Sequence, residues 1–310
     1  MRVTQSMISN NMLSNLSNSY SKLDQYNNQL SSGKKITKPS DDPVVAMKGI
    51  YYRSDVTQVE QYKRNLSEAT NWVESSDGAL SDVTTTLQRI RELTVQGASD
   101  TNSPESRQAL AAEVRQLIDH IGTIGNTMVG DKYIFNGVNT TTKPVNYSTT
   151  LDATGQIDTT ATAVPPLIAS SFYSNNSNYN VEVSKGVNVP ANVDPSTVFD
   201  PATFKQLADL HNALVTNDTA GINASLGQVD SIIQNVLTAQ TKVGATQNRV
   251  DMISDRLDNQ EVVANRIMSE NEDANVDDVI TQLKTQQSVQ NAALGVGARI
   301  IQPTLLDFLH

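Results

Sequence analysis

Three histidines are the residues of this 310-residue chain best suited to acid–base or metal chemistry. His120, His211 and His310 stand far apart, and none lies in a zinc-binding spacing with a glutamate beside it. The chain has no cysteine, which excludes a thiol nucleophile, a disulfide and a cysteine metal site. We expect His120 to be an exposed helix residue. We therefore predict a protein that is not an enzyme, with no catalytic, cofactor-binding or metal-binding residue.

One acidic segment imitates the opening of a calcium-binding loop. Asp273, Asn275 and Asp277 have the alternate spacing of such a loop. The sixth position is then Asp278, where the turn needs glycine, and the twelfth is Lys284, where a bidentate glutamate is needed. The segment is better interpreted as an acidic break between two helices.

A second imitation is the pair Gly295 and Gly297, which begins a dinucleotide-binding glycine pattern. Ile300 stands where the third glycine should be, and no strand is expected before the pair. A close contact between two helices explains these glycines better than a phosphate site.

The charge balance bears on possible partners. The net charge is −10, so nucleic acid is not an expected partner, because phosphate binding needs a basic face. Residues 1–40 are locally basic, but no aromatic residues alternate with the lysines, and a solvated helix face is the favoured interpretation.

No stretch has the apolar length of a membrane span, so no membrane insertion is expected. Residues 1–10 also lack the apolar core of a signal peptide.

Both outer segments carry heptad stripes. In the first, apolar or small residues alternate at spacings of four and three before Gly33 ends the helix; they are Met12, Leu16, Ser19, Leu23, Tyr26 and Leu30. The last segment runs from Val279 through Leu283, Val296 and Ile300 into an apolar group formed by Leu305, Leu306, Phe308 and Leu309. Neither segment can bury its own face, so we expect both to be partner-binding.

The inner helical segments share the same spacing. Asp42 is placed to cap a helix with Pro43 at its first position, and a stripe then runs without a slip over residues 59–97. Further helices are expected over residues 104–128, 204–214 and 226–264. We expect one intramolecular core for these stripes, including Leu66, Leu80, Leu87, Leu117, Val236 and Val250.

Between the helical halves the composition changes to Thr, Asn, Ser and Pro. Val181, Val183, Val187 and Val189 fall on alternate positions around Lys185-Gly186, which predicts a β-hairpin, and residues 152–155 predict a second turn. We expect a small inserted β domain that a short linker could replace over residues 145–195.

The predicted fold class is α+β, mainly α: an elongated, coiled-coil-like helical trunk formed by the N- and C-terminal halves, with a small inserted β domain and terminal helices. The expected segments are an N-terminal polymerisation helix (1–42), two trunk halves (43–132 and 203–270), the β domain (133–202) and a C-terminal polymerisation helix (271–310).

Several motifs resemble the flagellin family. Leu-Ser-Ser-Gly-Lys-Lys-Ile at residues 30–36, Pro-Ser-Asp-Asp-Pro at 39–43, Asp-Gly-Ala-Leu at 77–80, residues 87–96 and Gln-Asn-Arg-Val at 247–250 are similar to blocks of that family. The resemblance covers most of residues 1–138 and 240–310. Residues 133–144, 269–274 and 302–309 favour a subunit at the junction of hook and filament over the filament subunit.

The resemblance implies a structural, extracellular subunit that is exported by the flagellar type III apparatus without a cleaved signal peptide. The implied partners are copies of itself in a ring, a hook-associated protein on the hook side, flagellin on the filament side and an export chaperone. Two alternatives stay open at this point: the filament flagellin itself, and a secreted adhesin-like binding protein.

Overall fold

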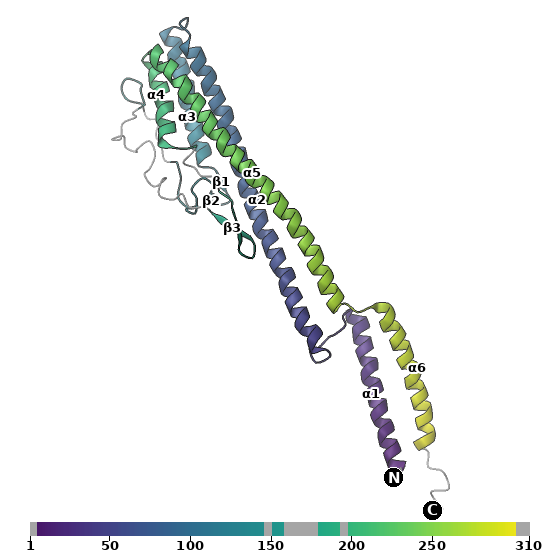
Figure 1. Cartoon of the computed structure of the whole chain (residues 1–310). Coiled ribbons are helices and arrows are strands. Elements are labelled where there is room, and N and C mark those ends of the chain that lie inside the picture. Colours follow the sequence, from purple (N-terminus) through teal and green to yellow (C-terminus); the bar gives the residue numbers. More distant parts are fainter. Residues whose placement is uncertain (1–4, 146–150, 158–178, 193–197, 302–310) are drawn as a thin grey trace, which may run out of the picture. The chain divides into compact units, whose positions relative to one another are not determined.

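The computed structural model describes residues 5–145, 151–157, 179–192 and 198–301 (Figure 1). The chain divides into two compact units, which we call the terminal unit (residues 1–59 and 259–310) and the central unit (residues 60–258). Two long helices, α2 (Pro43–Ala98) and α5 (Thr219–Glu272), contribute residues to both units. The mainly helical character of the described chain confirms the predicted fold class.

The terminal unit also contains α1 (Gln5–Ser32) and α6 (Val276–Ile301), which lie side by side in Figure 1. The predicted signals for the end of α1 and the start of α2 are confirmed. Gly33 follows α1 with a φ of 69°, a conformation that glycine adopts without strain. The Asp42 carboxylate accepts hydrogen bonds from the backbone N–H groups of Val44 and Val45, at 2.9 and 3.1 Å, and so caps α2.

In the central unit α2 and α5 run side by side, joined at the surface by the ion pairs Arg91–Asp230 (2.6 Å) and Lys63–Asp258 (2.7 Å). Every predicted stripe residue of α2 from Leu66 to Gly97 is buried. The stripe tolerates small polar residues because each hydroxyl donates to the carbonyl one turn earlier, as Thr94 does to Ile90 over 2.7 Å. In α5 Ile232 is buried, whereas its neighbour Ile233 is only partly buried.

Helix α3 (Pro104–Gly125) begins as predicted, with Ser103 accepting from the Ser106 N–H. It ends before the expected residue 128, because Met128 already belongs to a strand and is exposed. Ile118 is the fully buried residue of this turn, and the predicted Leu117 is only partly buried. His120 is exposed, as expected.

Helix α4 (Pro201–Val215) packs against α3 and buries His211. Burial lowers the pKa of this imidazole, because the charged form loses its hydration, and the nearby Arg115 acts in the same direction. The adjacent Asn212 amide binds both backbone groups of Ile157, at 2.7 and 2.8 Å, and so fixes the second predicted turn against α4.

The described part of the insertion contains two antiparallel pairs of strands. One joins β1 (Met128–Val129) to β2 (Lys132–Tyr133), and the other joins β3 (Asn180–Ser184) to β4 (Val187–Pro190). The second pair is the predicted hairpin, with Val181 opposite Val189 and Gly186 at a φ of 74° in the turn.

The insertion packs on the central helices. Trp72 of α2 is only 2% exposed; its ring stacks on Tyr179 with centroids 5.0 Å apart, and its Nε1 donates to the Ile134 carbonyl over 3.4 Å. The Tyr179 hydroxyl donates to Glu68 over 3.1 Å. Phe135 and Phe199 add a second buried aromatic contact at 4.9 Å. The insertion therefore contributes to the hydrophobic core of the central unit.

Candidate assembly surface

Helices α1 and α6 meet along one seam. The α6 residues of this seam repeat at spacings of four and three and are buried or partly buried: Val279, Leu283, Gln286, Gln290, Ala293 and Gly297. Gln286 donates to the Ser19 hydroxyl over 2.7 Å, and a Cβ placed on Gly297 would collide with the end of Met12. Polar and small residues thus occupy positions that large apolar residues would take in a strong pair.

Gln290 is the least satisfied member of the seam. It is 5% exposed, and neither its Nε2 nor its Oε1 has a hydrogen-bond partner among the described residues. A buried polar group without a partner costs about 1–3 kcal/mol. The pairing of α1 with α6 is accordingly weak for its length.

The predicted assembly residues fall into three groups. Met12, Leu16, Leu23 and Leu283 are partly buried in the helical pair, whereas Leu30 and Val296 are exposed. The side chain of Ile300 lies outside the described residues, as do Leu305, Leu306, Phe308 and Leu309. The expected close contact at the glycine pair holds for Gly297, while Gly295 faces open space.

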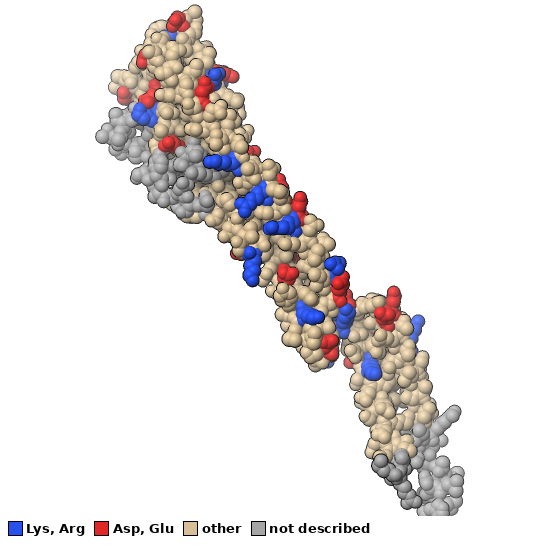
Figure 2. All heavy atoms as spheres, in the orientation of Figure 1, with Lys and Arg blue, Asp and Glu red and all other residues tan. Residues whose placement is uncertain are grey.

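Large apolar side chains on α1 and α6 also remain exposed beside the seam. Met7, Leu13 and Tyr20 of α1 are each more than half exposed, and Val289 and Leu294 of α6 are 51% and 42% exposed. Residues 5–21 and 285–298 contain no charged side chain at all. Figure 2 shows charged side chains on one half of this pair of helices and an uncharged surface over the described residues of the other half. A surface that is apolar and uncharged on both helices is typical of an interface.

A second apolar surface in the terminal unit was missed from the sequence. Val44, Met47, Ile50 and Tyr51, in the first turns of α2, are 55–69% exposed, and Val262 of α5 is 68% exposed. A signal was present, because Val44, Met47 and Tyr51 have a three–four spacing of their own, one residue out of phase with the stripe that contains residue 59. Spacing alone cannot tell a stripe that faces the core from one that faces outward.

Glu272, the last residue of α5, is the most buried acid among the described residues of the terminal unit, at 4% exposure. Its carboxylate lies 2.6 Å from Arg53 Nε and 3.5 Å from Lys34 Nζ. A Cβ on Gly49 would stand 2.7 Å from Glu272 Oε1, so this position of α2 leaves room for the carboxylate. The hydrogen bond that Arg53 donates to the Glu272 carboxylate raises the pKa of Arg53 further above its already high ordinary value.

The segments around Glu272 are also joined through the backbone. The Lys35 N–H donates to the Glu272 carbonyl over 2.6 Å, the Ala274 N–H donates to the Gly33 carbonyl over 2.8 Å, and Asn271 donates to the Val45 carbonyl over 3.1 Å. Asp273 pairs with Lys34 at 2.7 Å, which lowers the pKa of this carboxyl. We call residues 33–35, 45–53 and 270–274 the Glu272 joint; it brings the basic and acidic segments of the sequence together.

The acidic break itself has a structural role. The Asn275 side chain accepts from the Asp277 N–H over 3.2 Å at the start of α6, as a helix cap. In the part of the chain that the structure describes, no three His, Asp or Glu side chains gather closely enough to hold a metal ion. Within those same residues, no helix is long and apolar enough to cross a membrane.

Comparison with known proteins agrees with this architecture. Residues 3–140 match the bacterial flagellin N-terminal helical region, and residues 226–309 match the bacterial flagellin C-terminal helical region. The flagellar hook-associated protein 3 of Salmonella typhimurium is 25% identical over 301 residues, covering 94% of this chain and 95% of the relative.

Two solved structures have a similar fold. A flagellar hook-associated protein from Vibrio parahaemolyticus gives a TM-score of 0.65 at 20% identity, covering 75% of this chain and 100% of that one. The flagellar junction protein FlgL from Legionella pneumophila gives 0.53 at 15% identity, covering 73% and 99%. Since the two helical regions together match more than half of its residues, the chain belongs to the bacterial flagellin family, the structural proteins of the flagellum.

Proposed function

We propose that this flagellin-family subunit forms the junction between the hook and the filament, and that its terminal unit carries the assembly surface. The observation that carries the proposal is the α1–α6 pair, with its weak polar seam and outward apolar side chains on a charge-free surface. The full-length similarity to a hook-associated protein 3 supports the position at the junction.

The assembly surface has two parts. The first comprises the residues expected from the sequence, namely Met12, Leu16, Leu23, Leu30, Leu283, Val296, Ile300, Leu305, Leu306, Phe308 and Leu309, together with the exposed Leu13 and Leu294 of the same helices. The second is the exposed start of α2 around Met47 and Tyr51. Burial of apolar area contributes about 25 cal/mol per Å², so association of several copies supplies stability that one α1–α6 pair lacks.

The proposed partners follow from this position. Copies of the chain form a ring, a hook-associated protein contacts it on the hook side, and flagellin contacts it on the filament side. We further propose export by the flagellar type III route without a cleaved signal peptide, and an export chaperone that covers the apolar segments before assembly.

Disruption of the gene in the source bacterium tests the junction role. Cells should then make hooks without filaments and release flagellin into the medium, and the wild-type gene should restore filaments. A count of copies per flagellum separates a junction ring, with few copies, from a filament subunit, with very many. Intact filaments in the disrupted strain would contradict the proposal.

A pair of exposed substitutions tests the surface itself. Leu13→Ser with Leu294→Ser removes outward apolar area without touching the core, because both residues are exposed. The matched control, Asn10→Ser with Asn291→Ser, changes exposed polar residues on the same two helices. The first variant should be exported and folded, with an unchanged melting midpoint, yet support fewer filaments than the control. Equal filament numbers would remove these residues from the surface.

A further inference from the structure

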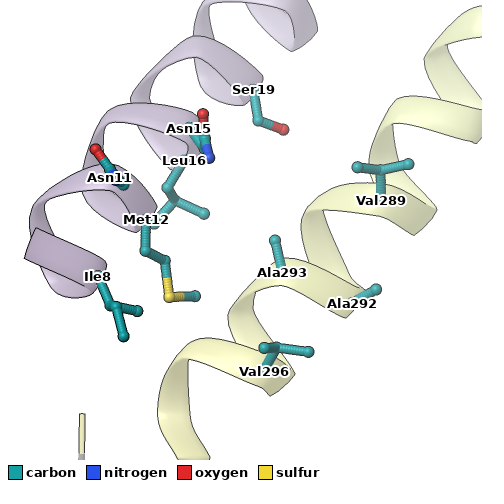
Figure 3. A pocket seen from close by; sticks show the side chains of 10 residues that line it. All are labelled: Ile8, Asn11, Met12, Asn15, Leu16, Ser19, Val289, Ala292, Ala293 and Val296. Atoms are coloured by element: carbon teal, nitrogen blue, oxygen red, sulfur yellow. The ribbon is translucent and has the colours of Figure 1, made fainter. Parts of the chain in front are cut away.

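The apolar surface of the terminal unit carries little information about how neighbouring copies align. Figure 3 shows the ten side chains that line the space between α1 and α6, and none of them is charged. Burial of apolar area is favourable in many relative positions, because the hydrophobic effect has no preferred direction. Charged groups distinguish one position from another, since like charges that meet are unfavourable. The charged side chains of the central unit are therefore suited to set the alignment.

A row of basic side chains follows α5 in the central unit. Lys242, Arg249 and Arg256 are seven residues apart, so they occupy one flank of the helix over roughly 21 Å. All three are exposed, and Figure 2 shows basic side chains following one another along the visible face of α5. Arg249 donates to the Asn188 carbonyl over 3.5 Å, and none of the three forms an ion pair with an acid among the described residues. We call these three residues the basic row.

Acidic side chains occupy the opposite flank of α5. Asp251 follows Arg249 by two residues, which places it about 200° around the helix from the basic row. Asp258 is one heptad further along and pairs with Lys63 of α2 at 2.7 Å. The Asp251 carboxylate is exposed, accepts a hydrogen bond from Gln247 over 3.4 Å and forms no ion pair within the described residues. Helix α5 is thus basic on one flank and acidic on the other.

Helix α2 adds two acids to this second side. Asp77 stands 14 residues after Lys63 and 14 before Arg91, and both of these bases pair with acids of α5. Asp77 therefore lies on the side of α2 that borders the acidic side of α5, with Glu74 one turn before it. Both acids are exposed, and neither has an ion pair among the described residues. We call Glu74, Asp77 and Asp251 the acidic flank.

The basic row and the acidic flank overlap in height along the central helices. Lys63 and Arg91 on α2 are 28 residues apart, and so are their partners on α5, so the two helices run antiparallel in register. Residues 242–256 of α5 are therefore level with residues 65–79 of α2. A rotation about an axis parallel to these helices carries one surface onto the other in the next copy without a shift along the axis, as a closed ring requires.

We propose that the basic row of one copy pairs with the acidic flank of the next copy, so that the central units stand side by side around the ring. The inference rests on the proposed function, because the ring of copies is part of it, and it adds which faces of the central unit meet. The two faces differ, so the contact is head to tail and repeats from copy to copy. The net charge of −10 favours this pairing, since copies that met acid to acid would repel each other.

Reversal and exchange of the charges test the proposal in the assembled flagellum. Arg249→Glu with Arg256→Glu should reduce the number of filaments severalfold, because acids then meet acids between copies. Glu74→Lys with Asp77→Lys should do the same, because bases then meet bases. All four changes together should restore filaments, since the attraction forms again with its direction reversed.

A matched control separates this contact from a general effect of charge. Asp82→Lys with Asp131→Lys makes the same change in net charge on two exposed acids outside the acidic flank, and it should leave filament numbers unchanged. All of these side chains are exposed, so circular dichroism should give an unchanged melting midpoint for every variant. A variant with all four changes that makes no more filaments than its two halves would overturn the proposal. So would an equal loss of filaments in the control.

Crosslinking of isolated flagella reads the contact directly, since the chain has no cysteine of its own. With Arg249→Cys and Asp77→Cys in one chain, a short bismaleimide should join copies into trimers and larger multimers, because each copy contributes both faces. Arg249→Cys with Asp82→Cys is the control and should give no such series.

The crosslinked products decide between the possible neighbours. Dimers alone, equal multimers in the control, or a product that contains a different flagellar protein in place of a second copy would each overturn the proposal. The crosslink reports contacts between copies wherever the subunit assembles. Its result is therefore decided independently of the filaments that the gene-disrupted strain makes, which test the junction role.

Discussion

The Arg53 guanidinium donates to the Glu272 carboxylate over 2.6 Å, although the arginine side chain is 64% exposed and the glutamate side chain only 6%. A carboxylate this buried needs opposite charge and hydrogen bonds to offset its lost hydration. Arg53, together with Lys34, supplies both from segments far away in sequence. The pair therefore fixes the end of α5 to the start of α2 and to the residues after α1.

Glu272→Ala should lower the free energy of unfolding of the terminal unit by about 1–3 kcal/mol, less than for a fully buried pair because Arg53 and Lys34 remain hydrated. Hydrogen exchange over residues 33–53 and 270–280 measures the effect. Glu270→Ala is the control, because Glu270 forms an exposed pair with Arg266 one turn earlier. Equal exchange in the two variants would show that the joint adds no stability.

Leu80→Ala should destabilise the central unit by about 2–5 kcal/mol, because Leu80 is fully buried in the α2 stripe and its removal leaves a cavity. Val95→Ala on the same helix removes a side chain that is 49% exposed and should change the melting midpoint little. Calorimetry of the two variants makes the comparison, and an unchanged midpoint for Leu80→Ala would contradict a shared core.

The buried His211 predicts a defined pH dependence. Its pKa is lowered in the folded protein, so the unfolded chain takes up the proton at a higher pH, near 6.5. The stability of the neutral, buried form is therefore complete above about pH 6.5 and is lost as the pH falls from there toward the folded pKa. His211→Gln should flatten this part of the curve of melting midpoint against pH; the same slope in both proteins would exclude His211 as the cause.

The weak seam between α1 and α6 predicts unequal protection in the free subunit. Amides of residues 5–30 and 280–301 should exchange much faster than those of residues 60–97, because Gln286, Gln290 and Gly297 replace large apolar contacts in the seam. Assembly should slow the exchange of the first two ranges. Protection of these ranges equal to that of residues 60–97 in the free subunit would contradict folding coupled to assembly.

Trp72 reports on the contact between the insertion and α2, since it is the only tryptophan. Tyr179→Ala removes its stacked ring and should shift the tryptophan emission to longer wavelength and cost about 1–3 kcal/mol. Tyr20→Ala, at an exposed position of α1, is the control.

Replacing residues 145–195 with a short linker should keep the helices but lower the melting midpoint, which circular dichroism measures. An unchanged midpoint would show that the insertion adds nothing to the core.

Local signals in the sequence determined where the main elements begin and end. Asp42 with Pro43, Ser103 with Pro104, and Gly33 act within one helical turn of themselves, so their effect does not depend on distant residues. The alternating valines around Gly186 fixed the hairpin for the same reason. The seven-residue repeat also identified the buried stripe of α2, because a long stripe without a slip has one consistent face.

Only the tertiary structure decided which faces of the outer helices are buried and which residues meet. On α6 the buried positions of the seam are Gln290 and Gly297, whereas Val289 and Val296 stay 51% and 55% exposed, a choice that spacing alone leaves open. The Glu272 joint gathers residues from opposite ends of the sequence, and no local pattern marks them as partners. The physical reason is that a helix's own residues set its periodicity, while the surface it packs against selects which face is buried.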